Sequence, residues 1–134
     1  MNDLATIKTL TICSSSKFYE TVQTLAKEMT SAGLNVFTPR FDFNEEVVNV
    51  TMADKISLTN EFLRKIGRSD AIYVIDRAGY TGRSVCIEIG YASALGKVVI
   101  LSEPPSEDAV RALTSEIVAV GEITKRIRPR GNYA

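Results

Sequence analysis

The sequence predicts an α/β protein, because segments typical of β-strands alternate with amphipathic segments typical of helices along its whole length. Strands that alternate with helices are joined by right-handed crossovers, which place the strands parallel in one sheet with helices on both faces. The chain has 134 residues, 45% of them apolar, and is long enough to bury one core. We therefore expect an open, mostly parallel five-stranded sheet in a three-layer sandwich of the flavodoxin or Rossmann type.

Five short segments rich in β-branched and apolar residues are predicted to form the strands. The first has the sequence TIKTLTIC, and the third, AIYVI, is apolar throughout. Gly33 precedes the second segment and Pro39 follows it, as is usual at the ends of elements. The predicted strands are residues 6–13, 34–38, 71–75, 97–101 and 117–120.

Helices are predicted between these strands, where apolar residues recur every three or four positions. The third of them carries Glu88 in its first turns. Residues 40–52 form a long connection without a clear pattern, and a connection of this length is often functional. The expected helices are residues 18–33, residues 52–67, the helix of Glu88, and residues 106–113.

The composition restricts the class of partner. Sixteen basic residues balance sixteen acidic ones, so no strong field attracts nucleic acid or an anionic membrane, and a small molecule is the expected partner. The absence of histidine excludes histidine catalysis, and two cysteines cannot form a four-ligand zinc site. We expect no metal and no cofactor. No segment of signal-peptide type and no 18-residue apolar run is present, so cytoplasmic location with reduced thiols is expected.

One domain is expected to span residues 1–134, because the chain contains no linker, repeat or low-complexity stretch. Basic residues cluster between Lys125 and Arg130. Residues 122–134 are predicted to form a flexible basic tail, which is either a solvated terminus or an arm that reaches a neighbouring subunit or a phosphate.

Polar residues that follow the strands are the candidates for a binding site, because open parallel sheets bind ligands beyond the carboxyl ends of their strands. After the first strand, Ser14, Ser15, Ser16 and Lys17 offer hydroxyls, backbone N–H groups and a positive charge that suit a phosphate or another anion. Serine is also a common N-cap, and capping alone would explain this segment. Asp70 precedes its strand, so we expect it at the opposite edge, away from the site.

The loop from Asp76 to Ser84 follows the third strand and opens the next helix. Ser84 is a candidate N-cap, and with Gly82 and Arg83 it offers a hydroxyl, backbone amides and a guanidinium to an anionic group. Gly79 and Gly82 allow the chain to pass close to a ligand, or they serve only to make turns.

Glu88 is expected one turn into this helix, on the face that also carries Ser84 and Tyr91. The helix dipole favours its ionised form there, which suits a nucleophile or an electrostatic stabiliser better than a general acid. A glutamate at this place could also merely complement the dipole. Ile87 and Ile89 on either side favour a function, because a charge in an apolar stretch needs a reason.

The run SDAIYVIDRAGYTGRSVCIEIGYASALGKVVI, from Ser69 to Ile100, resembles the core of the nucleoside 2-deoxyribosyltransferase family and the related deoxynucleoside 5′-monophosphate N-glycosidases. The stretch TLTICSSSKFYETVQTLAKEMTSAGLNVFTPR is similar to the first strand, loop and helix of that family. The resemblance is most specific at the segment EIGYA, which begins at Glu88. It implies that Glu88 attacks the anomeric carbon of the sugar and forms a glycosyl–enzyme intermediate.

The same resemblance implies substrate-binding residues in three places. Residues after the first strand would contact a 5′-phosphate, the loop before Glu88 would hold sugar or phosphate, and two aromatic rings of the long connection would enclose the base or anchor their own loop. These residues are Ser14, Ser15, Ser16 and Lys17; Gly82, Arg83 and Ser84; and Phe41 and Phe43.

One position departs from the family pattern. The family usually has an aspartate in the helix before the third strand, which helps to protonate the leaving base or to position the sugar. In this chain Phe62 stands near that position, and Glu61, Asn60 or Asp76 could substitute. Without a second acidic group, departure of the base loses general-acid assistance, which contributes about 10²- to 10⁴-fold.

The sequence therefore predicts an enzyme that cleaves the N-glycosidic bond of a nucleoside or nucleoside 5′-monophosphate, by transfer to another base or by hydrolysis. The alternatives are a non-catalytic nucleotide-binding or sensing domain, in which Glu88 contacts ribose hydroxyls, and an α/β scaffold for protein interaction. The resemblance also implies a homodimer or larger homo-oligomer. The base, the preference at the 2′-hydroxyl and the need for a 5′-phosphate stay open.

Overall fold

The computed structural model describes residues 3–128, which form an all-parallel sheet with the strand order β2-β1-β3-β4-β5. This order is that of the flavodoxin type, so the predicted fold class is confirmed. The strands are β1 (Thr9–Ser14), β2 (Asn35–Phe37), β3 (Ala71–Ile75), β4 (Val98–Leu101) and β5 (Glu116–Ile117).

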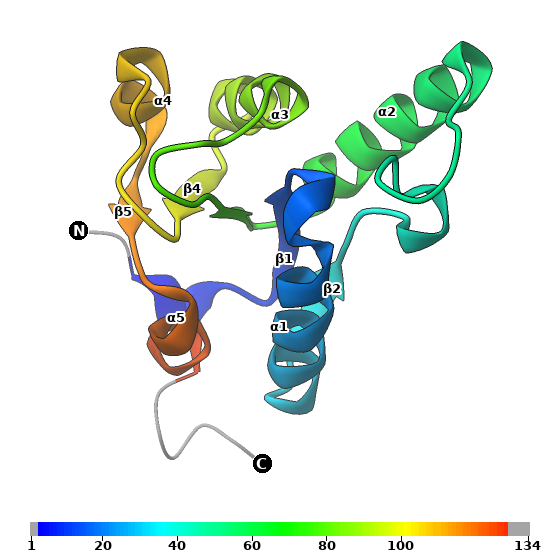
Figure 1. Cartoon of the computed structure of the whole chain (residues 1–134). Coiled ribbons are helices and arrows are strands. Elements are labelled where there is room, and N and C mark those ends of the chain that lie inside the picture. The colour runs from blue at the N-terminus through cyan, green and yellow to red at the C-terminus, as the bar shows by residue number, and fades with distance from the viewer. Residues whose placement is uncertain (1–2, 129–134) are drawn as a thin grey trace.

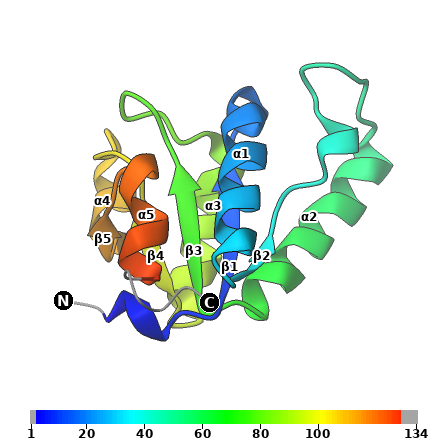
Figure 2. The same cartoon turned by 90° about the horizontal axis from the view of Figure 1, so that it is seen from below.

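Helices cover both faces of the sheet, as Figure 1 shows. One face packs against α1 and α5, and the other packs against α2, α3 and α4. The α-helices are α1 (Tyr19–Ser31), α2 (Met52–Gly67), α3 (Arg83–Ala94), α4 (Asp108–Leu113) and α5 (Val120–Ile127), and the short 3₁₀-helices are η1 (Leu4–Thr6), η2 (Ser16–Phe18) and η3 (Phe41–Phe43). In Figure 2, the N-terminal end of α2 and the loop before it extend away from the sheet.

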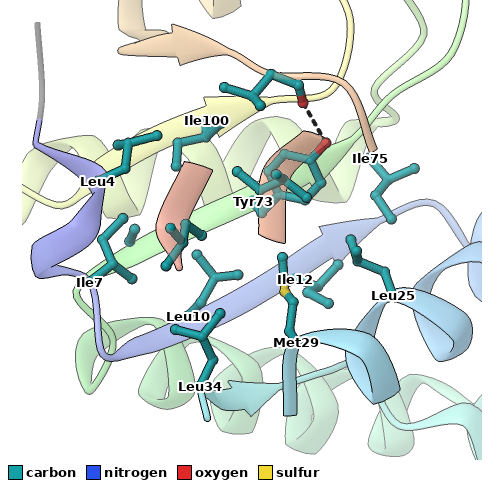
Figure 3. Packing of buried hydrophobic residues seen from close by; sticks show 14 of the residues in the cluster. Leu4, Ile7, Leu10, Ile12, Leu25, Met29, Leu34, Tyr73, Ile75 and Ile100 are labelled. Atoms are coloured by element: carbon teal, nitrogen blue, oxygen red, sulfur yellow. Dashed lines mark hydrogen bonds between the residues drawn. The ribbon is translucent and has the colours of Figure 1, made fainter. Parts of the chain in front are cut away.

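Tyr73 is the largest fully buried side chain of the core and lies between β1, β4 and the helices of one face (Figure 3). Its hydroxyl donates a hydrogen bond of 2.6 Å to the carbonyl oxygen of Val118. The polar end of the ring is thereby satisfied inside the core, where an unpaired hydroxyl would be costly. The bond also fixes the chain between β5 and α5 against the centre of the sheet.

Helix α5 occupies residues where the sequence predicted the start of a flexible tail. Ile123 and Ile127 stand four positions apart, and this spacing puts both on the face that is buried against the sheet. The hydroxyl of Thr124 donates to the carboxylate of Glu28 at 2.9 Å, and Arg128 donates to the carbonyl of Ile7 at 2.9 Å. Residues 122–128 are therefore a packed part of the domain, and the rest of the predicted tail lies outside the described residues.

The other elements fall close to their predicted positions. Both α2 and β3 begin and end at the predicted residues, whereas the first strand starts later because residues 4–6 form η1. The fifth strand was predicted at 117–120, but its ladder ends at Ile117, because the chain turns at the edge of the sheet to begin α5. Asp70 accepts hydrogen bonds from the backbone of Lys8 and Thr9 at the amino-terminal edge of the sheet, as expected for a residue away from the site. Among residues 3–128, no helix has the length and apolarity that crossing a membrane requires.

Candidate active site

A cleft of about 700 Å³ opens beyond the carboxyl ends of β1 and β3. These two strands are the switch point of the sheet, because the chain runs outward from β1 to β2 and then returns across β1 to β3. Ligands of open α/β sheets bind at such a switch point, and a cleft of this size accepts a molecule as large as a nucleotide.

Four parts of the chain line the cleft. They are the residues after β1, the loop before α3 with the first turns of α3, one face of α2 with the connection before it, and the loop between β4 and α4 at Ser106 and Glu107. The lining includes Ser14, Ser15, Ser16 and Tyr19; Gly79 to Cys86 and Glu88; and Arg40, Phe43, Lys55, Leu58, Thr59, Glu61, Phe62 and Lys65.

Glu88 reaches the cleft from the second turn of α3 and is only partly exposed. Burial raises the pKa of its carboxyl to about 8, although the adjacent Cys13 thiol and the Lys55 ammonium both lower it. The sequence had predicted that the helix dipole would keep Glu88 ionised, but a helix dipole supplies only about 0.3–1 kcal/mol. Desolvation outweighs the dipole, so Glu88 is mostly protonated at neutral pH when the cleft is empty.

The first turn of α3 presents backbone amides at the cleft. Gly82 is the N-cap residue, with φ at +96°, and no side chain caps the helix. A β-carbon at Gly82 would have ordinary contacts, including Ser15 at 3.8 Å, so the backbone conformation is what favours glycine here. Ser84, which was the predicted N-cap, is instead the second residue of the helix and is exposed. The uncapped amides and Ser15 thus meet at one end of the cleft.

The three serines after β1 line the cleft, and one of them also caps a short helix. The hydroxyl oxygen of Ser15 accepts a hydrogen bond of 3.3 Å from the backbone N–H of Lys17 and caps η2, as the capping interpretation predicted. Ser14 donates to the carbonyl of Ser15 at 2.9 Å, and Ser16 donates to the carboxylate of Glu46 at 3.2 Å. Because Ser15 only accepts in its cap, its own hydroxyl hydrogen is left to donate to a ligand.

Two of the predicted substrate-binding residues do not line the cleft. Lys17 is not among the cleft-lining residues, although its ammonium lies 5.0 Å from the centre of the ring of Tyr80, which does line the cleft. The ring of Phe41 packs edge-to-face on Tyr19, with ring centroids 5.4 Å apart, and contacts the core. Phe41 therefore anchors its loop, whereas Phe43 lines the cleft. Of the two alternatives that the sequence left open, anchoring the loop fits Phe41, and enclosing a base stays a prediction for Phe43 alone.

Asp76 is also absent from the cleft lining, although it was predicted to be catalytic. Its side chain is fully buried, and one carboxylate oxygen accepts from the hydroxyl of Ser102 at 3.0 Å and from the backbone N–H of Glu103 at 2.9 Å. Burial raises the pKa of Asp76, against the effect of these hydrogen bonds. Asp76 joins the β3–α3 loop to the β4–α4 loop, and this placement argues against its predicted role as the acid for the leaving base.

A second contact joins the same two loops. The backbone N–H and the hydroxyl of Ser106 both donate to the carbonyl of Gly79, at 3.2 and 3.0 Å. The backbone N–H of Ala78 donates to the carboxylate of Glu103 at 3.0 Å. Together with Asp76, these bonds hold the loop that precedes α3.

One face of α2 lines the opposite side of the cleft and was not predicted as a group. Glu61 lies there, with one carboxylate oxygen 3.4 Å from the ammonium of Lys65 and the other 3.9 Å from the guanidinium of Arg40. Asn60 is not a lining residue, and its side-chain amide donates to the carbonyl of Ile56 at 2.8 Å. Of the residues suggested in place of the family aspartate, only Glu61 lines the cleft. The helical spacing of Leu58, Glu61, Phe62 and Lys65 was the signal that could have identified this face.

Solved structures with the same fold include enzymes that act on glycosidic bonds. A 2-deoxyribosyltransferase from the psychrotolerant bacterium Bacillus psychrosaccharolyticus superimposes with a TM-score of 0.66 at 18% identity, over 87% of this chain and 90% of that one. The chain has the fold of the 2-deoxyribosyltransferases. The CMP N-glycosidase BcmB of Clostridium botulinum matches with a TM-score of 0.58 at 16% identity, over 90% of this chain and 98% of that one.

A conserved protein from Enterococcus faecalis V583 is similar to the same extent, with a TM-score of 0.67 at 12% identity, over 92% of this chain and 99% of that one. No protein-family model and no curated protein matches the sequence. The likeness that the sequence suggested is therefore confirmed in the fold.

Proposed function

We propose that the protein cleaves the N-glycosidic bond of a nucleoside or nucleoside 5′-monophosphate, with Glu88 as the nucleophile. The observation that carries the proposal is the position of Glu88, whose carboxyl lies in a nucleotide-sized cleft at the switch point of the sheet. The fold, which is shared with a 2-deoxyribosyltransferase and a CMP N-glycosidase, supports the same reaction class.

The two ends of the cleft suit the two ends of a nucleotide. The uncapped amides at the start of α3, with Ser15 and Arg83, attract an anionic group such as a 5′-phosphate. Phe43 and Phe62, which line the cleft along the α2 side, offer apolar ring surface to a base. A nucleotide that binds in this direction has its sugar between the two ends, beside Glu88.

The reaction then has two steps, as in retaining glycosidases. The ionised carboxylate of Glu88 attacks C1′, the bond from C1′ to the base nitrogen breaks, and its electron pair leaves with the base, which takes up a proton. Water or a second base next attacks C1′ and releases Glu88 as a carboxylate. With a pKa of about 8, roughly one molecule in ten has Glu88 ionised at pH 7, so attack requires the minor protonation state.

None of the residues suggested in place of the family aspartate is placed as an acid for the leaving base. Asp76 is buried outside the cleft, and Glu61 pairs as a carboxylate with the cations of Lys65 and Arg40, at 3.4 and 3.9 Å. Protonation of the base by water is a route that needs none of these residues. We therefore expect a slow enzyme, by up to the 10²- to 10⁴-fold or so that a positioned acid contributes.

A nucleotide sensor is the second candidate, and the raised pKa of Glu88 favours it. A protonated carboxyl donates a hydrogen bond, which suits contact with a ribose hydroxyl better than attack on carbon. In this case the same cleft would bind a nucleotide without breaking it.

Chromatography of the free base decides between the two functions. The wild type, Glu88→Gln and the surface control Glu122→Gln are each incubated with nucleosides and 5′-monophosphates, with and without an acceptor base. We expect base release by the wild type and the control and none by Glu88→Gln. Equal absence of release from all three proteins, with nucleotide binding retained, would support the sensor and contradict the enzyme.

A further inference from the structure

Helices α2 and α3 carry a large apolar surface that the described part of the chain leaves exposed. Of the ten large apolar side chains exposed there, seven lie on these helices, at the end of α3 or in the loop before α2. Exposed apolar side chains are usually scattered singly, so their concentration on two neighbouring helices indicates an interaction surface. This surface, here named the α2–α3 face, consists of Met52, Ile56, Leu63, Ile87, Tyr91 and Leu95.

Along α2, one stripe runs from the core into the solvent. Met52, Ile56 and Leu63 stand four and seven residues apart on one side of the helix, and Thr59 lies between the last two. The fully buried Ile66 follows on the same side, and Leu63 is half-buried against the same cluster. Towards the other end, Ile56 is 58% and Met52 is 74% exposed, because this end of α2 extends beyond the sheet (Figure 2). The stripe is therefore covered at one end only.

The outward side of α3 is apolar as well. Ile87, Tyr91 and Leu95 recur at every fourth residue and are between 37% and 61% exposed. The two charged residues of this helix are Arg83 in its first turn and Glu88, which reaches the cleft. A helix that meets water on one side normally places charged and polar residues there. This side of α3 instead has the composition of a surface that is covered.

The two apolar sides belong to neighbouring helices. Both helices contact the same buried cluster, α2 through Ile66 and α3 through Val85 and Ile89. Figure 1 shows both on one face of the sheet, with α2 inclined away from the sheet toward its N-terminal end. A partner that packs on this face can therefore contact both helices.

The size of the α2–α3 face matches that of a protein interface. Its five exposed side chains together present on the order of 500 Å², at the exposed fractions that they have in the single chain. A standard interface buries about 800 Å² on each partner, of which roughly 55–65% is apolar. The face thus supplies the apolar area that one partner of a stable complex needs.

Spacing and charge indicate a second copy of the chain as the partner. The stripe on α2 follows alternating spacings of four and three residues, which is the pattern of a helix that packs against another helix. The outward side of α3 offers no row of charges to a charged protein or an anionic membrane. An uncharged helical face fits another face of the same kind. In a two-fold dimer the same patch meets itself, and here it does so without bringing like charges together.

We propose that the α2–α3 face is the interface of a two-fold symmetric dimer, in which α2 and α3 of one copy pack against α2 and α3 of the other. The proposal goes beyond the proposed function and does not depend on it. In such a dimer the partner supports the N-terminal half of α2, whose other side lines the cleft at Lys55 and Leu58. Dimer formation therefore holds that side of the cleft in place.

Sedimentation equilibrium of the wild type at chain concentrations up to about 100 µM tests the dimer, because interfaces of standard size have micromolar or lower dissociation constants. We expect a particle of twice the chain mass of 14.7 kDa. Hydrogen exchange locates the contact: the amides of residues 52–59 should exchange more slowly at high than at low chain concentration.

Ile56→Glu and Ile87→Glu place a charge on one helix each, where the partner is apolar. Each should raise the dissociation constant about tenfold or more, the effect of burying a polar group without a partner. Both side chains are more than half exposed in the single chain, so the variants should keep the wild-type circular dichroism spectrum. Ile117→Glu is the matched control, because this isoleucine is 47% exposed on β5, outside the α2–α3 face, and the variant should dimerise as the wild type does.

Three results contradict the proposal. A wild type that keeps the mass of one chain up to about 100 µM overturns the dimer. A dimer that neither Ile56→Glu nor Ile87→Glu weakens uses another surface of the molecule. A dimer that Ile117→Glu weakens as much as the two variants do is not specific to the α2–α3 face. None of these results bears on base release, so the proposed function is tested separately.

Discussion

Glu88 should make the protein less stable as the pH rises, and Glu88→Gln should abolish much of that loss. Its pKa in the folded protein is about 8, above the ordinary value of 4.5. Between these two values the unfolded chain has released the proton and the folded chain has not, so the free energy of unfolding falls as the pH rises. A rise from 4.5 to about 8 corresponds to about 5 kcal/mol, at about 1.4 kcal/mol for each tenfold change in proton affinity.

Urea denaturation at pH 4.5, 7 and 9 measures this contribution, because glutamine matches the protonated glutamate in shape and does not titrate. We expect Glu88→Gln and the wild type to unfold at similar urea concentrations at pH 4.5, and the variant to be more stable at pH 9 by several kcal/mol, up to about 5. Burial raises the pKa of the Cys13 thiol well above the ordinary value, so this thiol also lowers the stability near pH 9, but it does so in both proteins. A stability difference that is the same at all three pH values would refute the reasoning.

Three other predictions follow from the cleft. If Glu88 must be ionised to attack, kcat/KM for base release should rise with pH up to about 8 and then level off, and a rate that falls over this range would contradict a nucleophilic Glu88. Asp76→Ala removes the acceptor of the part-buried Glu103 backbone N–H, whereas the Ser102 hydroxyl keeps the carbonyl oxygen of residue 76 as an acceptor, and the variant should lose about 1–3 kcal/mol in free energy of unfolding, measured by urea denaturation. Gly79→Ala should also destabilise, by about 1–3 kcal/mol, because φ is +84° there and the new β-carbon would lie 2.8 Å from that of Ser106; a thermal midpoint unchanged from wild type would show that the loop adapts.

The sequence predicted the fold well where the pattern of apolar residues was strong. Strand β3 is an unbroken apolar run between polar residues, and α2 has a long helical period, so their bounds were predicted correctly. Helix α5 was missed because it is short and polar on one face, and its two buried isoleucines become visible as a pattern only when the helix is known.

The candidate site was predictable in position but less so in detail. Residues at the carboxyl ends of β1 and β3 do line the cleft, because topology alone places them there. Topology does not say which way a side chain points, and Asp76 and Lys17 therefore fall outside the lining. Predicting Glu61 as a cleft residue would have required knowing which face of α2 lies across the cleft from β1. The pKa of Glu88 depends on desolvation, which a sequence pattern does not contain.

The loops after β3 and β4 are tied together by Asp76, Ser102 and Glu103 and again by Gly79 and Ser106. These bonds join two of the segments that line the cleft, and they support the start of α3 with its amides and Glu88, whereas the opposite side of the cleft belongs to α2. If the protein acts as proposed, substitutions on the cleft face of α2 change the contacts of the base and leave the surroundings of the reacting carbon in place, so new substrates can be acquired without rebuilding the chemistry.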